Sequence, residues 1–554
     1  MPRLLAFLFA FALFLPGTAL AQPADFGAYK PAPQFEEAET TSLYVPMRDG
    51  VRIAVSVHRP ARGGKAVEGR FPVIWHNTLA IDPAGVGEPR PGLAELTRHG
   101  YVVAVVARRG NGASFGVRRG YEDFTEHYDA YEMTEWLARQ PWSNGRAGMY
   151  GCSNTGEAVM HALTMRPPSL KAAWAGCFSL DRYDGHLRGS VIAQFGTGPA
   201  RTVEQDMQTT PVQGDEAKVL LRQAAEEHQA STNLFELMRT SPYRDSFSPL
   251  VMSRFWYEVS VGVKLDMVRQ SGVPLYIQGG WLDDFRTQGF VTLANLPGQA
   301  RMLIGPWRHC RFDGFDILSE QLRFFDHHLK GIDTGIADDP PVHYWRYDGR
   351  GGGSWQTASQ WPLPQARPQA IRLAAKTFKV EPEPTCPPDP QATGPAAGAF
   401  AVPCHPSHGA AYTQPPLKAD LTLVGHPVAD LWISADQPEA NLFVYLEEVA
   451  PDGTVTVLAE GRQRASLRKL HDPPWNNLGL PWRRSWREDE QPLTPGEPVQ
   501  VTFDLLAVAH TVPKGHRIQV AVTGSDPRER ARPGAAAKAT IRIDPRSTVT
   551  LPVL

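Results

Sequence analysis

The stretch Gly148–Leu163, G-M-Y-G-C-S-N-T-G-E-A-V-M-H-A-L, decides the fold that this sequence predicts. A short strand over Ala147–Tyr150 enters a turn of small residues with Ser153 at its apex, and a helix with an apolar face follows. A serine at such a strand-to-helix turn projects its hydroxyl above the sheet, beside the free N–H groups of the helix N-terminus. Gly151 and Gly156 flank it because a Cβ there would collide with the adjoining strand and helix. The spacing G-x-S-x-x-G is one residue longer than the usual G-x-S-x-G, so by itself this motif is also compatible with a plain loop.

Apolar runs alternate with amphipathic helices on both sides of this turn. Phe71–Trp75 and Tyr101–Ala107 are continuous apolar runs, as is usual for strands covered on both faces. Glu126–Gln140 predicts a helix, and Ala172–Phe178 predicts the next strand. This order predicts a parallel α/β sheet. Upstream, Thr41–Pro60 predicts a hairpin around an Asp-Gly turn.

Two later strands are followed by an acid and a histidine. The strand Pro274–Gln278 leads into G-G-W-L-D-D-F, which contains Asp283, and Ala300–Ile304 leads into G-P-W-R-H-C, which contains His309. Residues just past the carboxyl ends of parallel strands line the active-site crevice of an α/β sheet. Serine, acid and histidine also follow one another here in the chain order of α/β-hydrolases. We therefore predict a catalytic triad of Ser153, Asp283 and His309.

Changes in composition predict several units along the 554 residues. Helical periodicity from residue 181 to 270 interrupts the sheet pattern, and short alternating strands rich in Pro, Gly, Thr and Val begin near residue 340. The predicted units are a signal peptide (1–21), the first part of an α/β-hydrolase domain (22–180), an inserted helical cap (181–270), the second part of the hydrolase domain (271–338) and a C-terminal β-sandwich (339–554).

The N-terminus is typical of a secretory signal peptide. Arg3 precedes the apolar run Leu4–Leu15, which is too short to cross a bilayer, and Ala19-Leu20-Ala21 is a small-x-small cleavage site. Cleavage after Ala21 would export the protein to the periplasm or beyond, with no membrane attachment afterwards; a retained anchor is the alternative. The net charge of −2 gives no reason to expect nucleic acid as a partner.

The five cysteines are too few for a disulfide framework. Cys386 and Cys404 share one Pro-rich loop and are the only plausible local pair. Cys152, Cys177 and Cys310 are interpreted as small buried packing residues. No motif has metal-ligand spacing, and Arg108–Gly116 lacks the spacing of a phosphate-binding loop, so neither metal nor cofactor is predicted.

Several motifs together resemble one family. M-R-D-G-V-R-I, R-G-N-G-A-S and Q-P-W-S-N-G-R-A-G-M-Y-G-C-S, in this order, are similar to the cocaine esterase and X-prolyl dipeptidyl-peptidase family of α/β-hydrolases, over roughly residues 41–554. The family includes α-amino acid ester hydrolases and glutaryl-cephalosporin acylases. The resemblance implies a helical cap over the active site and a C-terminal jelly roll. It implies an exported serine hydrolase of the X-Pro dipeptidyl-peptidase or esterase type, acting on a small ester, amide or short peptide.

Other functions stay open at this point. An α-amino acid ester hydrolase or β-lactam acylase is one alternative, and a catalytically impaired binding protein with the hydrolase fold is another; a homo-oligomer is compatible with both. The impaired alternative rests on the oxyanion hole. The backbone N–H of Asn154 is one predicted donor. Leu79 stands where the family commonly has a tyrosine donor, and His76, Asn77, Thr78 or a main-chain N–H would have to replace it.

Three more residues are candidates for substrate binding. Asp284, with Asp181 or Asp184, could bind a substrate ammonium group as the carboxylate cluster of the α-amino acid ester hydrolases does, although a lone loop acid is usually solvated. Trp281 and Trp307 lie in the same strand-end segments as the predicted acid and base.

Overall fold

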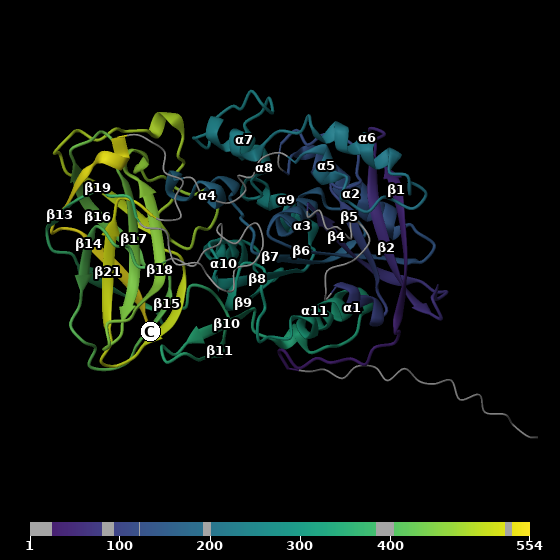
Figure 1. Cartoon of the computed structure of the whole chain (residues 1–554). Helices are drawn as coiled ribbons and strands as arrows, with labels where there is room; N and C mark the ends of the chain where they lie inside the picture. The colour runs from purple at the N-terminus through teal and green to yellow at the C-terminus, as the bar shows by residue number, and fades with distance from the viewer. Residues whose placement is uncertain (1–24, 80–92, 121, 192–200, 384–403, 527–534) are drawn as a thin grey trace, which may run out of the picture.

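The computed structural model describes residues 25–79, 93–120, 122–191, 201–383, 404–526 and 535–554. A hydrolase domain built on a central sheet lies beside a β-sandwich (Figure 1). The predicted signal peptide, residues 1–21, lies outside the described residues, as does Cys386. Among the described residues, no helix combines the length and the apolar character needed to cross a membrane.

The central sheet has the parallel core that the sequence predicts, flanked by antiparallel strands at both edges. The pairs β1–β2, β2–β5 and β10–β11 are antiparallel, and every pair from β5 to β10 is parallel. Because β10 pairs with β9, the hydrolase sheet continues beyond residue 338, where the sequence analysis ends this domain. The strands lie in the order β1 (Glu37–Pro46), β2 (Arg52–Arg62), β5 (Val102–Ala107), β4 (Phe71–Thr78), β6 (Ser143–Cys152), β7 (Leu170–Gly176), β8 (Leu275–Leu282), β9 (Ala300–Arg308), β10 (Val342–Tyr347) and β11 (Gly353–Ala358), with the short β3 (Lys65–Ala66) beside β2.

Helices cover both faces of this sheet, so its strands alternate between two apolar cores. Ile74 and Tyr276 pack into one core, whereas their neighbours Trp75 and Ile277 pack into the other. This is the two-residue period of a strand, and it explains why the central strands are apolar throughout. One face is covered by α1 (Leu93–Arg98) and α11 (Ile317–Phe325), and the other by α2 (Phe124–Ala138), α3 (Asn154–Met165), α9 (Leu265–Ser271) and α10 (Arg286–Asn295).

The segment between β7 and β8 forms a group of short helices with an apolar core of its own around Tyr183, Phe255 and Trp256. The last helix, α9, packs through Val268 into the hydrophobic core beneath α3. Figure 1 shows this group along the upper side of the hydrolase domain. The other helices are α4 (Arg182–His186), α5 (Val203–Asp206), α6 (Val219–His228), α7 (Leu234–Thr240) and α8 (Phe255–Val259).

Two sheets enclose a common apolar core in the C-terminal part, which includes Leu431, Leu442 and Val520. One sheet joins the hydrolase sheet through the parallel pair Tyr347–His510. It contains β12 (Arg367–Arg372), β13 (Lys376–Lys379), β15 (Leu421–Gly425), β16 (Val428–Ala435), β19 (Val499–Asp504), β20 (Val508–Val512), β22 (Thr540–Ile543) and β23 (Thr548–Val553). The other has the order β14 (Ala410–Thr413), β21 (Arg517–Thr523), β17 (Asn441–Val449), β18 (Val455–Arg464).

The contact between α3 and β7 gives a first prediction. A Cβ at Gly156 would lie 2.4 Å from the Gly176 carbonyl oxygen, which is backbone and cannot rotate away. We expect Gly156→Ala to lower the free energy of unfolding by about 1–3 kcal/mol, as overpacking does. Gly279→Ala in β8 is the matched control, because its Cβ would lie 3.5 Å from Ile304 and Met302 in ordinary contact. Urea unfolding followed by tryptophan fluorescence measures both, and equal stability of the two variants would contradict this account.

Candidate active site

The serine turn has the geometry of a nucleophile elbow. Ser153 lies between β6 and α3 with φ 64° and ψ −131°, a left-handed conformation that non-glycine residues rarely adopt. Its N–H donates to the Gly176 carbonyl (2.9 Å), and its own carbonyl accepts from the Glu157 N–H (2.9 Å). A Cβ at Gly151 would lie 2.0 Å from the Thr155 carbonyl oxygen, so this glycine is required as the sequence predicts. The backbone thus holds the Ser153 side chain at the carboxyl end of the sheet.

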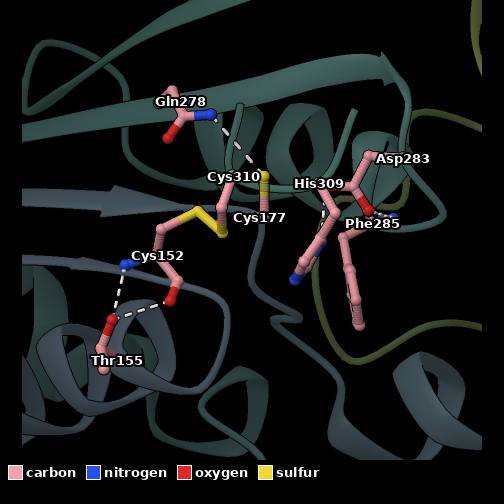
Figure 2. The surroundings of a disulfide bond; sticks show 8 residues. All are labelled: Cys152, Thr155, Cys177, Gln278, Asp283, Phe285, His309 and Cys310. Carbon is pink, nitrogen blue, oxygen red and sulfur yellow. Dashed lines mark hydrogen bonds and ion pairs between the residues drawn. A yellow bond between two sulfur atoms is a disulfide. The ribbon is translucent and has the colours of Figure 1, made fainter. Parts of the chain in front are cut away.

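The predicted acid and base are hydrogen-bonded to each other. Asp283 follows β8 and His309 follows β9, and Asp283 Oδ2 lies 3.1 Å from His309 Nδ1. The Asp283 side chain is buried, and its other oxygen accepts from the Phe285 N–H at 3.2 Å. The Phe285 ring also lies against the imidazole, with 5.6 Å between ring centroids. Asp283 therefore fixes the orientation of the imidazole and leaves Nε2 directed away from it (Figure 2).

A disulfide joins the serine turn to the histidine loop. Cys152 and Cys310 are bonded to each other, with their Cα atoms 5.9 Å apart (Figure 2), which corrects their interpretation as packing residues. Ser153 follows Cys152 and His309 precedes Cys310 directly. With Cα atoms about 3.8 Å apart along the chain, the Cα atoms of Ser153 and His309 are at most about 13.5 Å apart (5.9 + 3.8 + 3.8). The three predicted triad residues are thus brought to one edge of the sheet.

Cys177 is a free, buried cysteine next to this disulfide, as its predicted packing role requires. The Gln278 side-chain amide donates to its sulfur at 3.6 Å. Burial raises the pKa of the Cys177 thiol well above its usual value, and the negative charge of Asp283 and a hydrogen bond to that carboxylate raise it further. Cys404 is disulfide-bonded, whereas Cys386, the partner suggested by the sequence, lies outside the described residues.

The predicted oxyanion region lies at the ends of β4 and β6. Asn154 is the first residue of α3, so its N–H belongs to the unpaired amides of a helix N-terminus. Leu79 directly follows β4 and is half-buried. Arg108, a residue of this region that the sequence motifs do not reveal, is fully buried and donates to the carbonyls of Asn77 (3.3 Å) and Asn154. Arg108 therefore ties the end of β4 to the start of α3; the only signal in the sequence was its place after an apolar strand.

The proposed acidic cluster is in fact a mixed-charge pocket. Both oxygens of Asp181 accept from Arg244, and Asp184 accepts from Gln288 at 3.0 Å. Burial, and then the charge of Asp181, raise the pKa of Asp184 to about 6. Burial lowers the pKa of Arg188 and of Arg286, and the negative charge of Asp284 opposes this effect. The charged residues that line this pocket are Asp181, Asp184, Asp504, Arg188, Arg244, Arg462 and Arg483. Arginines therefore offset the acids.

The two tryptophans lie in the protein core, where the expected role in substrate binding finds no support. Trp281 is 4% exposed and donates its indole N–H to the Trp345 carbonyl at 2.6 Å. Trp307 is 1% exposed, packs against Phe315 and donates to the Asp313 carbonyl at 3.2 Å. Both indoles thus have their polar atom satisfied by backbone.

The fold and the elbow define the class of this protein, an α/β-hydrolase with a C-terminal β-sandwich. The family model described as X-Pro dipeptidyl-peptidase (S15 family) matches residues 49–311, and that of the X-Pro dipeptidyl-peptidase C-terminal non-catalytic domain matches residues 334–542. A Mycobacterium bovis protein named as a serine esterase is 30% identical over 89% of this chain and 91% of its own. The chain belongs to the S15 family of X-Pro dipeptidyl-peptidases and related serine esterases.

More distant relatives agree with this assignment. The cocaine esterase of a Rhodococcus species is 24% identical over 88% of this chain and 90% of its own. A solved structure, a CocE/NonD family hydrolase from Staphylococcus aureus, superposes with a TM-score of 0.72 at 21% identity, covering 94% of each chain. The protein is thus a serine hydrolase of the esterase or peptidase type, as the sequence resemblance implies.

The surroundings of Cys177 lead to a second prediction. Because the thiol is buried and held neutral, iodoacetamide should not alkylate Cys177 in the native protein at pH 8. It should do so once the protein is unfolded in guanidinium without reductant. Peptide mass spectrometry measures both states, and Cys177→Ser identifies the labelled site by its loss. Equal labelling of native and unfolded protein would contradict the described packing.

Proposed function

We propose that Ser153, His309 and Asp283 are the catalytic triad of this serine hydrolase, which cleaves esters through an acyl-enzyme. The Asp283–His309 hydrogen bond of 3.1 Å is the observation that carries the proposal. It is supported by the elbow conformation of Ser153 and by the disulfide between the neighbours of Ser153 and His309. The order serine, acid, histidine along the chain agrees with it.

The chemistry follows from the role of each group. Ser153 Oγ attacks the carbonyl carbon while His309 Nε2 takes its proton, because an unassisted hydroxyl is a weak nucleophile. Asp283 holds the Nδ1 proton in place and stabilises the imidazolium that forms. The Nε2–H then protonates the leaving alcohol or amine. A water molecule, deprotonated by the same imidazole, attacks the acyl-enzyme and releases the acid and free Ser153.

The tetrahedral intermediates need hydrogen-bond donors for their oxyanion. The N–H of Asn154, the residue after the nucleophile, is the donor we assign, and Arg108 holds the peptide that follows it by donating to the Asn154 carbonyl. Leu79 has no side-chain donor to add. We assign the second donor to the main-chain N–H of Leu79, which directly follows β4.

The mixed-charge pocket favours esters without an α-ammonium group. Arg244 already neutralises Asp181, so the acidic charge that would bind a substrate ammonium is offset within the protein. We therefore rank a simple esterase as the preferred activity, ahead of an α-amino acid ester hydrolase, a β-lactam acylase or an X-Pro dipeptidyl-peptidase. The relatives that span almost the whole chain and are named as esterases support the same order.

Export is part of the proposal. The N-terminal 21 residues have the pattern of a signal peptide, and a structural disulfide such as Cys152–Cys310 persists in oxidising compartments. We expect the mature chain to begin at Gln22. N-terminal sequencing of the native protein from cell fractions tests this, and an intact Met1 on cytoplasmic protein would contradict it.

The triad is tested by substitution of the nucleophile. Ser153→Ala should lower kcat by a factor on the order of 10⁴–10⁶, because the acyl-enzyme cannot form. Wild-type protein should react covalently with a fluorophosphonate at Ser153, and the variant should not. Ser354→Ala, which changes an exposed serine of β11, controls for general labelling. A folded wild-type protein without label would instead favour a catalytically impaired binding protein.

The preferred substrate is tested with a chromogenic panel. We expect kcat/KM for p-nitrophenyl butyrate to exceed that for Ala-Pro-p-nitroanilide and for α-amino acyl esters by at least about tenfold. The inverse order would show that the charge of Asp181 is available to an ammonium group despite Arg244. If the simple ester is preferred as expected, Arg244→Gln should reduce the ratio of the kcat/KM values for the simple ester and the α-amino acyl esters, since it leaves the Asp181 carboxylate unpaired.

A further inference from the structure

Three sulfur atoms lie together where the catalytic segments meet. The Sγ atoms of Cys152, Cys177 and Cys310 are all within 4.8 Å of one another. The Cys177 sulfur is also within 4.8 Å of a carboxylate oxygen of Asp283 and a ring nitrogen of His309. We name Cys152, Cys177 and Cys310 the sulfur cluster (Figure 2). It contacts the segments that carry all three proposed triad residues.

The disulfide spans two strands of the sheet. The order β6, β7, β8, β9 places the chain after β6 and the chain after β9 on non-adjacent strands, 158 residues apart in sequence. No backbone ladder therefore connects the serine turn to the histidine loop directly. Cys310 also has a left-handed φ of 56°, so the loop leaves β9 in a conformation that the surroundings must maintain. The covalent bond is the direct link between the two loops.

The Cys177 thiol connects this bond to the catalytic acid. It follows β7, between the strands that the disulfide spans, and is buried. Its sulfur lies within 4.8 Å of a carboxylate oxygen of Asp283, which places the S–H beside that carboxylate, and it accepts a hydrogen bond from the Gln278 amide at 3.6 Å. A donor to a buried carboxylate limits the orientations that the carboxylate can take.

We propose that the sulfur cluster positions the proposed triad: the disulfide keeps the Ser153 turn close to the His309 loop, and the Cys177 thiol keeps the Asp283 carboxylate directed toward His309. The proposal rests on the proposed triad. Cys152, Cys177 and Cys310 are thus positioning residues, which act on the reaction through their neighbours. Because a displacement of about 1 Å can cost on the order of 10²-fold in rate, loss of the disulfide affects the chemical step more than substrate binding.

The disulfide is tested with the full-length double variant Cys152→Ala/Cys310→Ala. We expect kcat for p-nitrophenyl butyrate to fall on the order of 10²-fold while KM changes less than threefold. The rate of fluorophosphonate labelling of Ser153 should fall with kcat. Cys404→Ala, which removes a disulfide outside the sulfur cluster, should keep kcat within twofold of wild type. A double variant that is folded by circular dichroism and loses less than fivefold in kcat would overturn this part of the proposal.

Reduction of the folded wild-type enzyme gives the same test if the double variant does not fold. Dithiothreitol converts the disulfide to two cysteine thiols and is itself oxidised to its cyclic disulfide. Mass spectrometry after alkylation measures how much Cys152 and Cys310 is reduced. We expect activity to fall in proportion to this fraction, in the Cys404→Ala background as well. Full activity with both thiols alkylated would overturn the proposal.

The thiol is tested by two substitutions of different chemistry. Cys177→Ala removes the donor to Asp283 and should lower kcat about fivefold, whereas Cys177→Ser keeps a donor and should restore most of the loss. Equal kcat values for the two variants would overturn the role of the thiol. These outcomes differ from failure of the triad itself, in which Ser153→Ala would keep activity and wild-type Ser153 would not be labelled.

Discussion

The active site depends on a contact between α3 and the end of β7 that leaves no space for a side chain. The Ser153 N–H donates to the Gly176 carbonyl, and Gly156 lies against the same carbonyl so closely that a Cβ would be 2.4 Å from it. This contact sets the position of the first turn of α3 and forces Ser153 into its left-handed conformation. The chain that leaves Gly176 then carries the Cys177 sulfur to within 4.8 Å of a carboxylate oxygen of Asp283, the proposed catalytic acid. One backbone oxygen thus fixes both the proposed nucleophile and part of its surroundings.

A network of buried charged side chains stabilises the position of α3 against the end of β7. Glu157, one turn into α3, accepts from the Ser179 N–H (2.8 Å) and hydroxyl (2.7 Å) and from Arg182, while Arg182 also pairs with Glu122 at 3.3 Å. Ser179 and Arg182 follow β7, so these bonds tie α3 to the chain that leads into the helical group. A buried ion pair is costly to break because one charge is left without a partner. The network therefore favours a single register of α3 over β7.

The sequence predicts the parts of this site that local pattern determines. The apolar runs predicted the central strands, and Ser153, Asp283 and His309 were predicted as a triad because each follows such a run in the order of an α/β-hydrolase. Local sequence pattern does not predict contacts between residues that are far apart in the chain. The Cys152–Cys310 bond joins residues 158 apart, and nothing in their spacing separates it from two buried thiols. The same holds for the pair of Arg244 and Asp181. The sequence motifs indicated the acidic residues, but not the guanidinium group that offsets their charge. The extension of the sheet through β10 depends on pairing with β9, which composition does not report.

Family membership fixes the scaffold more firmly than the substrate. The elbow, the Asp283–His309 bond and the order of the strands serve equally for cleavage of esters, amides and peptides, because all of these pass through the same tetrahedral intermediates. Specificity is set by how the groups around the site treat the substrate's charge and shape. Our proposal on specificity uses the pairing of Asp181 with Arg244, inside a pocket that the helical group, α10 and the β-sandwich share. Binding an ammonium group there would require breaking an ion pair that is already desolvated, and this cost is the basis of the proposed preference for simple esters.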